Sequence, residues 1–149
     1  MSVEIEIEVA AAVDQEMMEA VAQLIPQLSL SATIPSAAQL QEITASTCTT
    51  LLLARVPSQG RRIVGTLTLA VFRIPTGVRA WIEDVVVDST ARGNGVGEAL
   101  LREAARIAAS RGAQTLELTS SPSRESANRL YRRLGYQARE TNMYRKAIA

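Results

Sequence analysis

A glycine-rich hexapeptide at residues 92–97 is the feature that most constrains how this chain can fold. It reads Arg-Gly-Asn-Gly-Val-Gly and lies between an apolar run at 85–87 and an amphipathic segment at 96–111. A continuous apolar run is typical of a strand covered on both faces, and apolar residues at every third or fourth position indicate a helix. The sequence therefore predicts a strand–turn–helix unit with glycines in the turn.

Antiparallel strands are predicted before this unit. Apolar residues alternate with polar ones, or follow turn signals such as Pro-Ser-Gln-Gly and Pro-Thr-Gly, in four segments. These segments are residues 3–9, 50–56, 63–72 and 78–88. Beyond the hexapeptide we expect a strand at 115–119 and one or two closing strands over 136–146.

Helical periodicity appears in three further segments. The first starts at the capping residue Asp14 and runs to Pro26, and the second runs from Ser36 to about Ile43. The third is expected to be capped by Ser123 and ended by Gly135. The alternation of strands and helices predicts a mixed α/β fold in a single domain, residues 1–149.

Composition excludes several classes of protein. A chain of 149 residues buries enough surface to fold without a disulfide or metal. Its net charge of +1 gives no signal for nucleic-acid binding. No segment approaches the roughly 20 apolar residues that span a bilayer, so no membrane contact is expected. The acidic, alternating start of the chain is unlike a signal peptide, and we expect a cytoplasmic protein.

The absence of histidine narrows the possible chemistry. It excludes Ser-His-Asp and Cys-His nucleophiles and histidine-ligated zinc, and we expect no metal. Cys48, the only cysteine, cannot form an intrachain disulfide and is interpreted as a small hydrophobic residue. Any chemistry must therefore use carboxylates, tyrosine, backbone groups or water.

The hexapeptide has the properties of a phosphate-binding turn. The first turn of a helix has unpaired N–H groups and the positive end of the macrodipole, and glycines let an anion approach the backbone. An ordinary glycine-rich turn is the alternative. A Walker A loop is excluded because Glu98 follows Gly97. The dinucleotide fingerprint needs G-x-G-x-x-G, and here the third glycine is misplaced because Gly93, Gly95 and Gly97 are spaced two and two. Only Glu117, at the position of a ribose-binding acid, favours a nucleotide-dependent oxidoreductase.

Written as R-x-x-G-x-G, the hexapeptide resembles the CoA-binding motif of the GNAT superfamily of N-acetyltransferases. Residues 82–88 are similar to that family's fourth strand, which splays from the fifth and receives pantetheine. Residues 126–136 resemble its following motif, with Asn128, Tyr131 and the Leu-Gly-Tyr ending in register. The resemblance covers 80–136, and the first 79 residues match in element order alone. It implies a mostly antiparallel central sheet with splayed fourth and fifth strands and about four flanking helices.

The resemblance also implies the residues that bind acetyl-CoA, the co-substrate. Asn128 is expected at the pantetheine arm and Tyr131 beside the thioester sulfur. Backbone groups of the fourth strand are expected to pair with pantetheine, and amides of the hexapeptide to hold the pyrophosphate. These residues are Val85, Val86, Val87, Arg92, Gly93, Asn94, Gly95, Val96 and Gly97.

Acetyl transfer to an amine needs an acid and a base. With an ordinary pKa of about 10, Tyr131 keeps its proton at neutral pH and can protonate the leaving thiolate; otherwise it only packs its helix. Glu83 is expected to act as the base because simple alternation puts it on the same strand face as Val85 and Val87. Glu117 is the competing carboxylate, both could be solvated or paired, and water could replace either.

The resulting hypothesis is direct transfer of an acetyl group to an amine in a ternary complex. A ping-pong route is disfavoured because Cys48 lies far outside the motif region. The alternative is a catalytically silent CoA-binding sensor or assembly module. The acceptor is a small-molecule amine or a protein amino group, selected by loops such as 29–34 and 73–79, and a homodimer is plausible.

Overall fold

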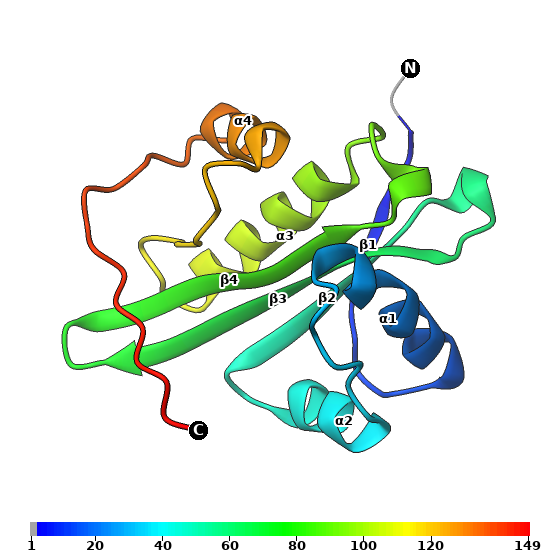
Figure 1. The fold of residues 1–149 in the computed structure, drawn as a ribbon, viewed down its shortest axis with the longest axis horizontal. Coiled ribbons are helices and arrows are strands. Elements are labelled where there is room, and N and C mark those ends of the chain that lie inside the picture. The colour runs from blue at the N-terminus through cyan, green and yellow to red at the C-terminus, as the bar shows by residue number, and fades with distance from the viewer. Residues whose placement is uncertain (1–2) are drawn as a thin grey trace. The chain divides into compact units, whose positions relative to one another are not determined.

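The computed structural model describes residues 3–149 and has a mixed α/β fold, as predicted (Figure 1). The strands are β1 (Glu6–Val9), β2 (Thr49–Arg55), β3 (Ile63–Ile74) and β4 (Gly77–Val87). The helices are α1 (Gln15–Leu28), α2 (Ala37–Ala45), α3 (Val96–Ser110) and α4 (Glu125–Arg133), with short 3-10 turns η1 (Pro57–Gln59) and η2 (Ser89–Ala91). The chain divides into two compact units, one up to Leu118 and one from Thr119.

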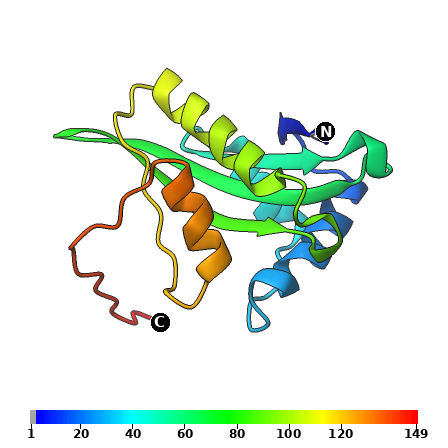
Figure 2. The ribbon, with the colours of Figure 1, turned by 90° about the horizontal axis from the view of Figure 1, so that it is seen from above.

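The first unit is built on an antiparallel sheet in the order β1-β2-β3-β4. Helix α3 covers one face of the sheet, and α1 and α2 cover the other (Figure 2). On the α1 side, Leu51 and Leu53 of β2 belong to the same buried cluster as Met17 and Leu24 of α1. Alternation along the strands therefore supplies an apolar surface to both helical layers.

Helix α3 packs closely on β3 at a glycine. A Cβ placed on Gly65 would lie 3.0 Å from Val96 Cγ1, 3.2 Å from the Val86 carbonyl oxygen and 3.3 Å from Leu100 Cδ1. The missing side chain thus lets the first turn of α3 approach the sheet. This contact sets the height of the α3 N-terminus above β3 and β4.

The predicted N-cap Asp14 and the predicted start of the second helix at Ser36 are confirmed. Asp14 Oδ1 accepts a hydrogen bond from the Met17 amide at 2.8 Å, and Ser36 forms a reciprocal capping box with Gln39. The expected end of the first helix at Pro26 is wrong, because α1 continues to Leu28. Proline removes one backbone donor and usually breaks a helix, yet here the helix tolerates it near its last turn.

The strand expected at 115–119 is reduced to one parallel bridge between Glu117 and Trp81. The Glu117 amide donates to the Ala80 carbonyl at 3.0 Å, and the Ile82 amide donates to the Glu117 carbonyl at 2.9 Å. Within the described residues this pairing does not continue past Ile82. The two segments therefore pair at one point only.

Two expectations for the second unit are wrong. The described residues 136–146 contain no strand. Helix α4 begins after Arg124 without a side-chain cap, and the Ser123 hydroxyl instead shares a hydrogen bond with the Ser121 hydroxyl at 3.0 Å. The helix ends before Gly135, as predicted, and the φ of Gly135, +95°, is the left-handed conformation common in a residue that follows a helix.

Among residues 3–149, the helices are all too short or too polar to cross a membrane.

Candidate active site

Strand β4 contains a β-bulge beside the Glu117 bridge. Glu83 pairs with Thr68 and Val86 with Thr66, so β4 has one more residue than β3 over this stretch. Asp84 occupies the bulge with a φ of +51°. Bulges reorient a strand and end its pairing. Here the bulge marks the point beyond which β4 is paired on its β3 side alone.

The bulge leaves main-chain groups of β4 open to a ligand. The Asp88 amide donates to the Val64 carbonyl at 2.7 Å, so alternation along the ladder turns the N–H and C=O of Val87 away from β3. The Val87 carbonyl accepts a long bond, 3.4 Å, from Arg92 Nε. Its amide donates no hydrogen bond within residues 3–149. An extended ligand could pair with this edge as an added strand.

The bulge also overturns the expected alignment of Glu83 with Val87. Val87 pairs with Gly65 and Glu83 with Thr68. Gly65 and Thr68 are an odd number of residues apart, so their partners lie on opposite faces of the sheet. Val87 therefore shares the α3 face, whereas Glu83 lies on the α1 and α2 face. Period-two alternation failed because one extra residue reverses the face of every later side chain.

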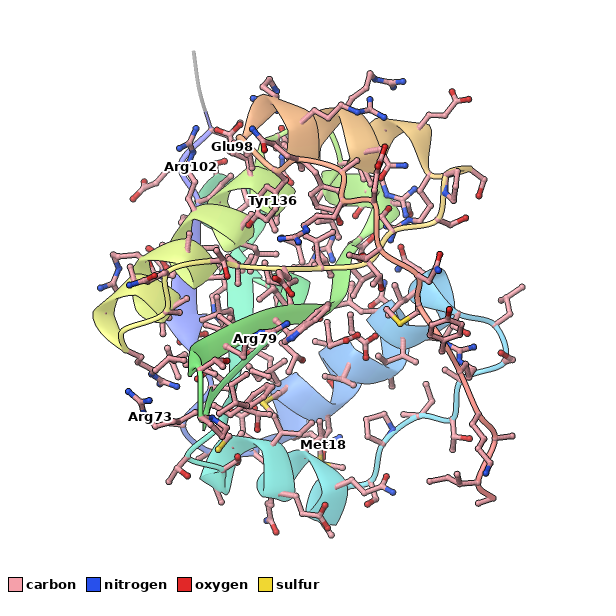
Figure 3. The ribbon with its side chains drawn as sticks, turned by 90° about the vertical axis from the view of Figure 1, so that its left-hand side faces the viewer. Met18, Arg73, Arg79, Glu98, Arg102 and Tyr136 are labelled. Carbon is pink, nitrogen blue, oxygen red and sulfur yellow. The ribbon has the colours of Figure 1, made fainter. Side chains whose placement is uncertain are left out.

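The two candidate bases differ in their contacts. Glu117 Oε2 accepts a hydrogen bond from Arg79 Nη2 at 2.9 Å. The same guanidinium lies 5.9 Å from the centre of the Trp81 ring, within cation–π range. The side chain of Arg79 is labelled in Figure 3. Glu83 is exposed and forms no ion pair or hydrogen bond among the described residues. Of the two carboxylates, Glu83 alone is free to accept a proton without losing an arginine partner.

The loop after β4 presents a row of unused amides at the N-terminus of α3. Gly93 and Gly95 both have a φ of +83°, a left-handed conformation that favours glycine. In the part of the chain that the structure describes, the amides of residues 93–97 donate no hydrogen bond. A Cβ on Gly93 would meet no atom within 4 Å, so the space beside it is open. These features suit a phosphate group.

Side-chain hydrogen bonds hold this loop and the turn that precedes it. Asn94 Nδ2 donates to the Ala91 carbonyl at 3.0 Å. Ahead of the loop, the buried Asp88 carboxylate accepts from Arg62 Nη1 at 2.9 Å and from the Thr90 amide at 3.0 Å. The hydrogen bond from the Thr90 amide, and to a smaller extent the one from Arg62, lowers the pKa of Asp88 below its usual value. Asp88 is not among the residues predicted for the site, although Asp-Ser-Thr at the end of a strand is a recognisable capping signal.

Two of the predicted site residues, Asn128 and Tyr131, lie in α4 of the second unit. They are three residues apart and so share a face of the helix. Asn128 Nδ2 donates to the Ser121 carbonyl at 3.0 Å. Tyr131 is 7% exposed, and its ring makes an edge contact with Tyr136 at 5.8 Å between centroids. Burial raises the pKa of Tyr131, with a smaller opposing effect from the charge of Arg124.

Comparison with known proteins identifies the family. The model of the acetyltransferase (GNAT) family matches residues 18–136. A glucosamine 6-phosphate N-acetyltransferase of Trypanosoma brucei brucei is 40% identical over 85 residues, which are 55% of this chain and 56% of that protein. The chain thus spans about half the length of this curated relative in the match.

Solved structures agree with the fold. An aminoglycoside acetyltransferase from an uncultured soil metagenomic sample, in complex with trehalose, superposes with a TM-score of 0.82 at 20% identity and covers 97% of this chain and 96% of its own. A Trypanosoma brucei acetyltransferase has a TM-score of 0.74 at 25% identity, and the match covers 97% of this chain and 100% of that one. A transcriptional regulator from Bacillus halodurans C-125 has a TM-score of 0.79 at 25% identity, and the match covers 95% of this chain and 100% of that one. Because the family match extends over most of the chain, this protein belongs to the GNAT family of acetyltransferases.

Proposed function

We propose that this protein transfers an acetyl group from acetyl-CoA to an amine by direct attack in a ternary complex. The observation that carries the proposal is the loop at 93–97, where unused amides at a helix N-terminus follow an open strand edge after one short turn, η2. A pyrophosphate needs the first feature and an amide-containing arm needs the second. Membership of the GNAT family supports both assignments.

The donor-binding roles follow from these features. Amides of the loop hold the pyrophosphate, with Arg92 adding a positive charge beside it. Main-chain groups of Val85 and Val87 pair with pantetheine, whereas those of Val86 face its partner Thr66 in β3. Asn128 is assigned to the same arm by the family resemblance. Acetyl-CoA supplies the activated thioester, and these residues orient it for attack. Orientation of the two reactants is the largest contribution expected from the protein.

Tyr131 is the proposed acid. Its raised pKa keeps the phenol protonated at neutral pH, and its hydroxyl forms no hydrogen bond with other described residues. A phenol in this state can donate its proton to a departing thiolate. Since burial disfavours the phenolate, the group is best suited to donate rather than to accept.

Glu83 is the proposed base, acting directly or through a water molecule. An amine is mostly protonated at neutral pH, with a pKa of about 8 for an α-amine and about 10.4 for lysine, so it must lose a proton before attack. Glu117 is less suited because its carboxylate is already bonded to Arg79 at 2.9 Å. If Glu83 is the base, the acceptor amine is expected on the α1 and α2 face of the sheet, where Glu83 lies.

We propose a small-molecule amine as the acceptor. The names of similar proteins include a glucosamine 6-phosphate N-acetyltransferase and an aminoglycoside acetyltransferase. A panel of amino sugars, aminoglycosides, polyamines, amino acids and peptides should be assayed by release of CoA thiol. At least one amine should accelerate thiol release. CoA binding without turnover on any amine would favour a catalytically silent sensor instead.

A further inference from the structure

Asp88 is a buried carboxylate that neither the proposed acid nor the proposed base uses. It is 2% exposed and lies at the end of β4. Its oxygens accept four hydrogen bonds, from Arg62 Nη1 at 2.9 Å, Gln23 Nε2 at 3.3 Å, and the amide and hydroxyl of Thr90 at 3.0 Å each. A buried charge is costly unless it is paired and fully hydrogen-bonded. The carboxylate of Asp88 meets both conditions.

The donors come from three separate segments. Gln23 belongs to α1, Arg62 directly precedes β3, and Thr90 lies in η2. Arg62 also bonds the Thr90 hydroxyl, which closes the network on itself. A second contact joins α1 to the same turn, because the Ser89 amide donates to Gln27 Oε1 at 2.9 Å. One carboxylate thus fixes η2 against both the sheet and α1.

The network continues along the main chain to the loop. The Ala91 amide donates to the Asp88 carbonyl at 2.9 Å, and the Ala91 carbonyl accepts from Asn94 Nδ2 at 3.0 Å. Ala91 is fully buried. Gly93, two residues further on, begins the row of unused amides. The direction of those amides therefore depends on how η2 is held.

We propose that Asp88 is a positioning residue for the pyrophosphate loop, acting through Thr90 and Ala91 on the amides of residues 93–97. The inference rests on the proposed function, since it assumes that the loop holds the pyrophosphate of acetyl-CoA. Asp88 is not a catalytic residue, because its carboxylate is enclosed by the protein's own donors. Its contribution is to the affinity and orientation of the pyrophosphate, and not to the chemistry at the thioester.

The test compares acetyl-CoA, which contains the pyrophosphate, with S-acetylpantetheine, which has the same thioester arm but lacks the pyrophosphate and the adenosine phosphate attached to it. In Asp88→Asn, kcat/KM with acetyl-CoA should fall about 10- to 100-fold, mostly through KM, as expected for weakened hydrogen bonds to a charged group. With S-acetylpantetheine it should change less than threefold. Calorimetric titration with CoA should show a parallel loss of affinity without need of an acceptor.

Asp14→Asn is the matched control. It makes the same change at another hydrogen-bonded carboxylate, the cap of α1, where asparagine caps as well as aspartate. Both donors should work as in the wild type. Thr90→Val, which removes one hydroxyl from the network at nearly constant shape, should show a smaller loss with the same donor selectivity, and it replaces Asp88→Asn if that variant does not fold.

Three results would overturn the inference. An equal loss with both donors would show that Asp88 only stabilises the fold, and unchanged CoA affinity in folded Asp88→Asn would show that it does not position the loop. A wild type that uses both donors equally well would refute the proposed pyrophosphate site, and this inference with it. The behaviour of the wild type therefore separates failure of the proposed function from failure of the role of Asp88.

Discussion

Proton delivery in the proposed reaction depends on the hydroxyl of Tyr131. The Tyr131→Phe variant keeps the ring that contacts Tyr136, so α4 should retain its packing. Turnover should fall about 10²- to 10⁴-fold, the usual effect of removing a positioned acid. Affinity for acetyl-CoA should change little, because the hydroxyl matters most as negative charge grows on the sulfur.

Turnover, affinity and melting temperature should be measured on one preparation of the Tyr131→Phe variant. A tyrosine that only packs would show a lower melting temperature with unchanged turnover per folded molecule. A loss of turnover below threefold, with affinity intact, would exclude the acid role and leave protonation of the thiolate to water.

Gly93 tests the loop by a single methyl group. Gly93 and Gly60 have nearly the same φ, +83° and +84°, and neither would bring a Cβ within 4 Å of another atom. Replacing either by alanine should therefore cost about 1–2 kcal/mol of folding free energy from the left-handed backbone alone. Only Gly93→Ala should also weaken CoA binding, by tenfold or more. Equal CoA affinity in the two variants, measured by titration, would mean that the pyrophosphate lies elsewhere.

The elements differ in how far their sequence predicted them. Caps at Asp14 and Ser36 and the left-handed glycines were predictable because each depends on side chains within a few residues. The bulge at Asp84 was not, since it exists only in the register between β3 and β4. The Asp88 carboxylate binds Arg62 and Gln23, which are separated from it by 26 and 65 positions in the sequence. No local sequence pattern could therefore predict this network.

The contact between α3 and β3 gives a prediction for a whole element. In Gly65→Ala the new methyl group would lie 3.0 Å from Val96 Cγ1 and 3.2 Å from a backbone oxygen, closer than packed atoms normally come. We expect a loss of about 1–3 kcal/mol in folding free energy from overpacking. The displaced first turn of α3 should also weaken CoA binding.

Denaturant unfolding and CoA titration of Gly65→Ala would check both effects. The additional loss of affinity separates this variant from Gly60→Ala, in which stability alone should fall. Unchanged stability would show that α3 can shift away from β3 without cost, and the height of its N-terminus would then not be set at Gly65.

For the molecule as a whole, ligand binding should report on both the donor and the domain organisation. A ligand that binds only the folded state stabilises it by about 2.7 kcal/mol at 100 times its Kd, which corresponds to about 5–10 °C in melting temperature for a chain of this size. Acetyl-CoA should produce such a shift, whereas NAD and ATP should not. An equal shift with NAD would contradict the assignment of the donor.

Trp81, the only tryptophan, lies in β4 and reports on the first unit, while far-UV circular dichroism reports on all helices. If residues 1–149 form one domain, as the sequence predicts, both signals should follow one transition with and without acetyl-CoA. Separate transitions, with acetyl-CoA moving only the one seen by Trp81, would show that the unit from Thr119 unfolds independently.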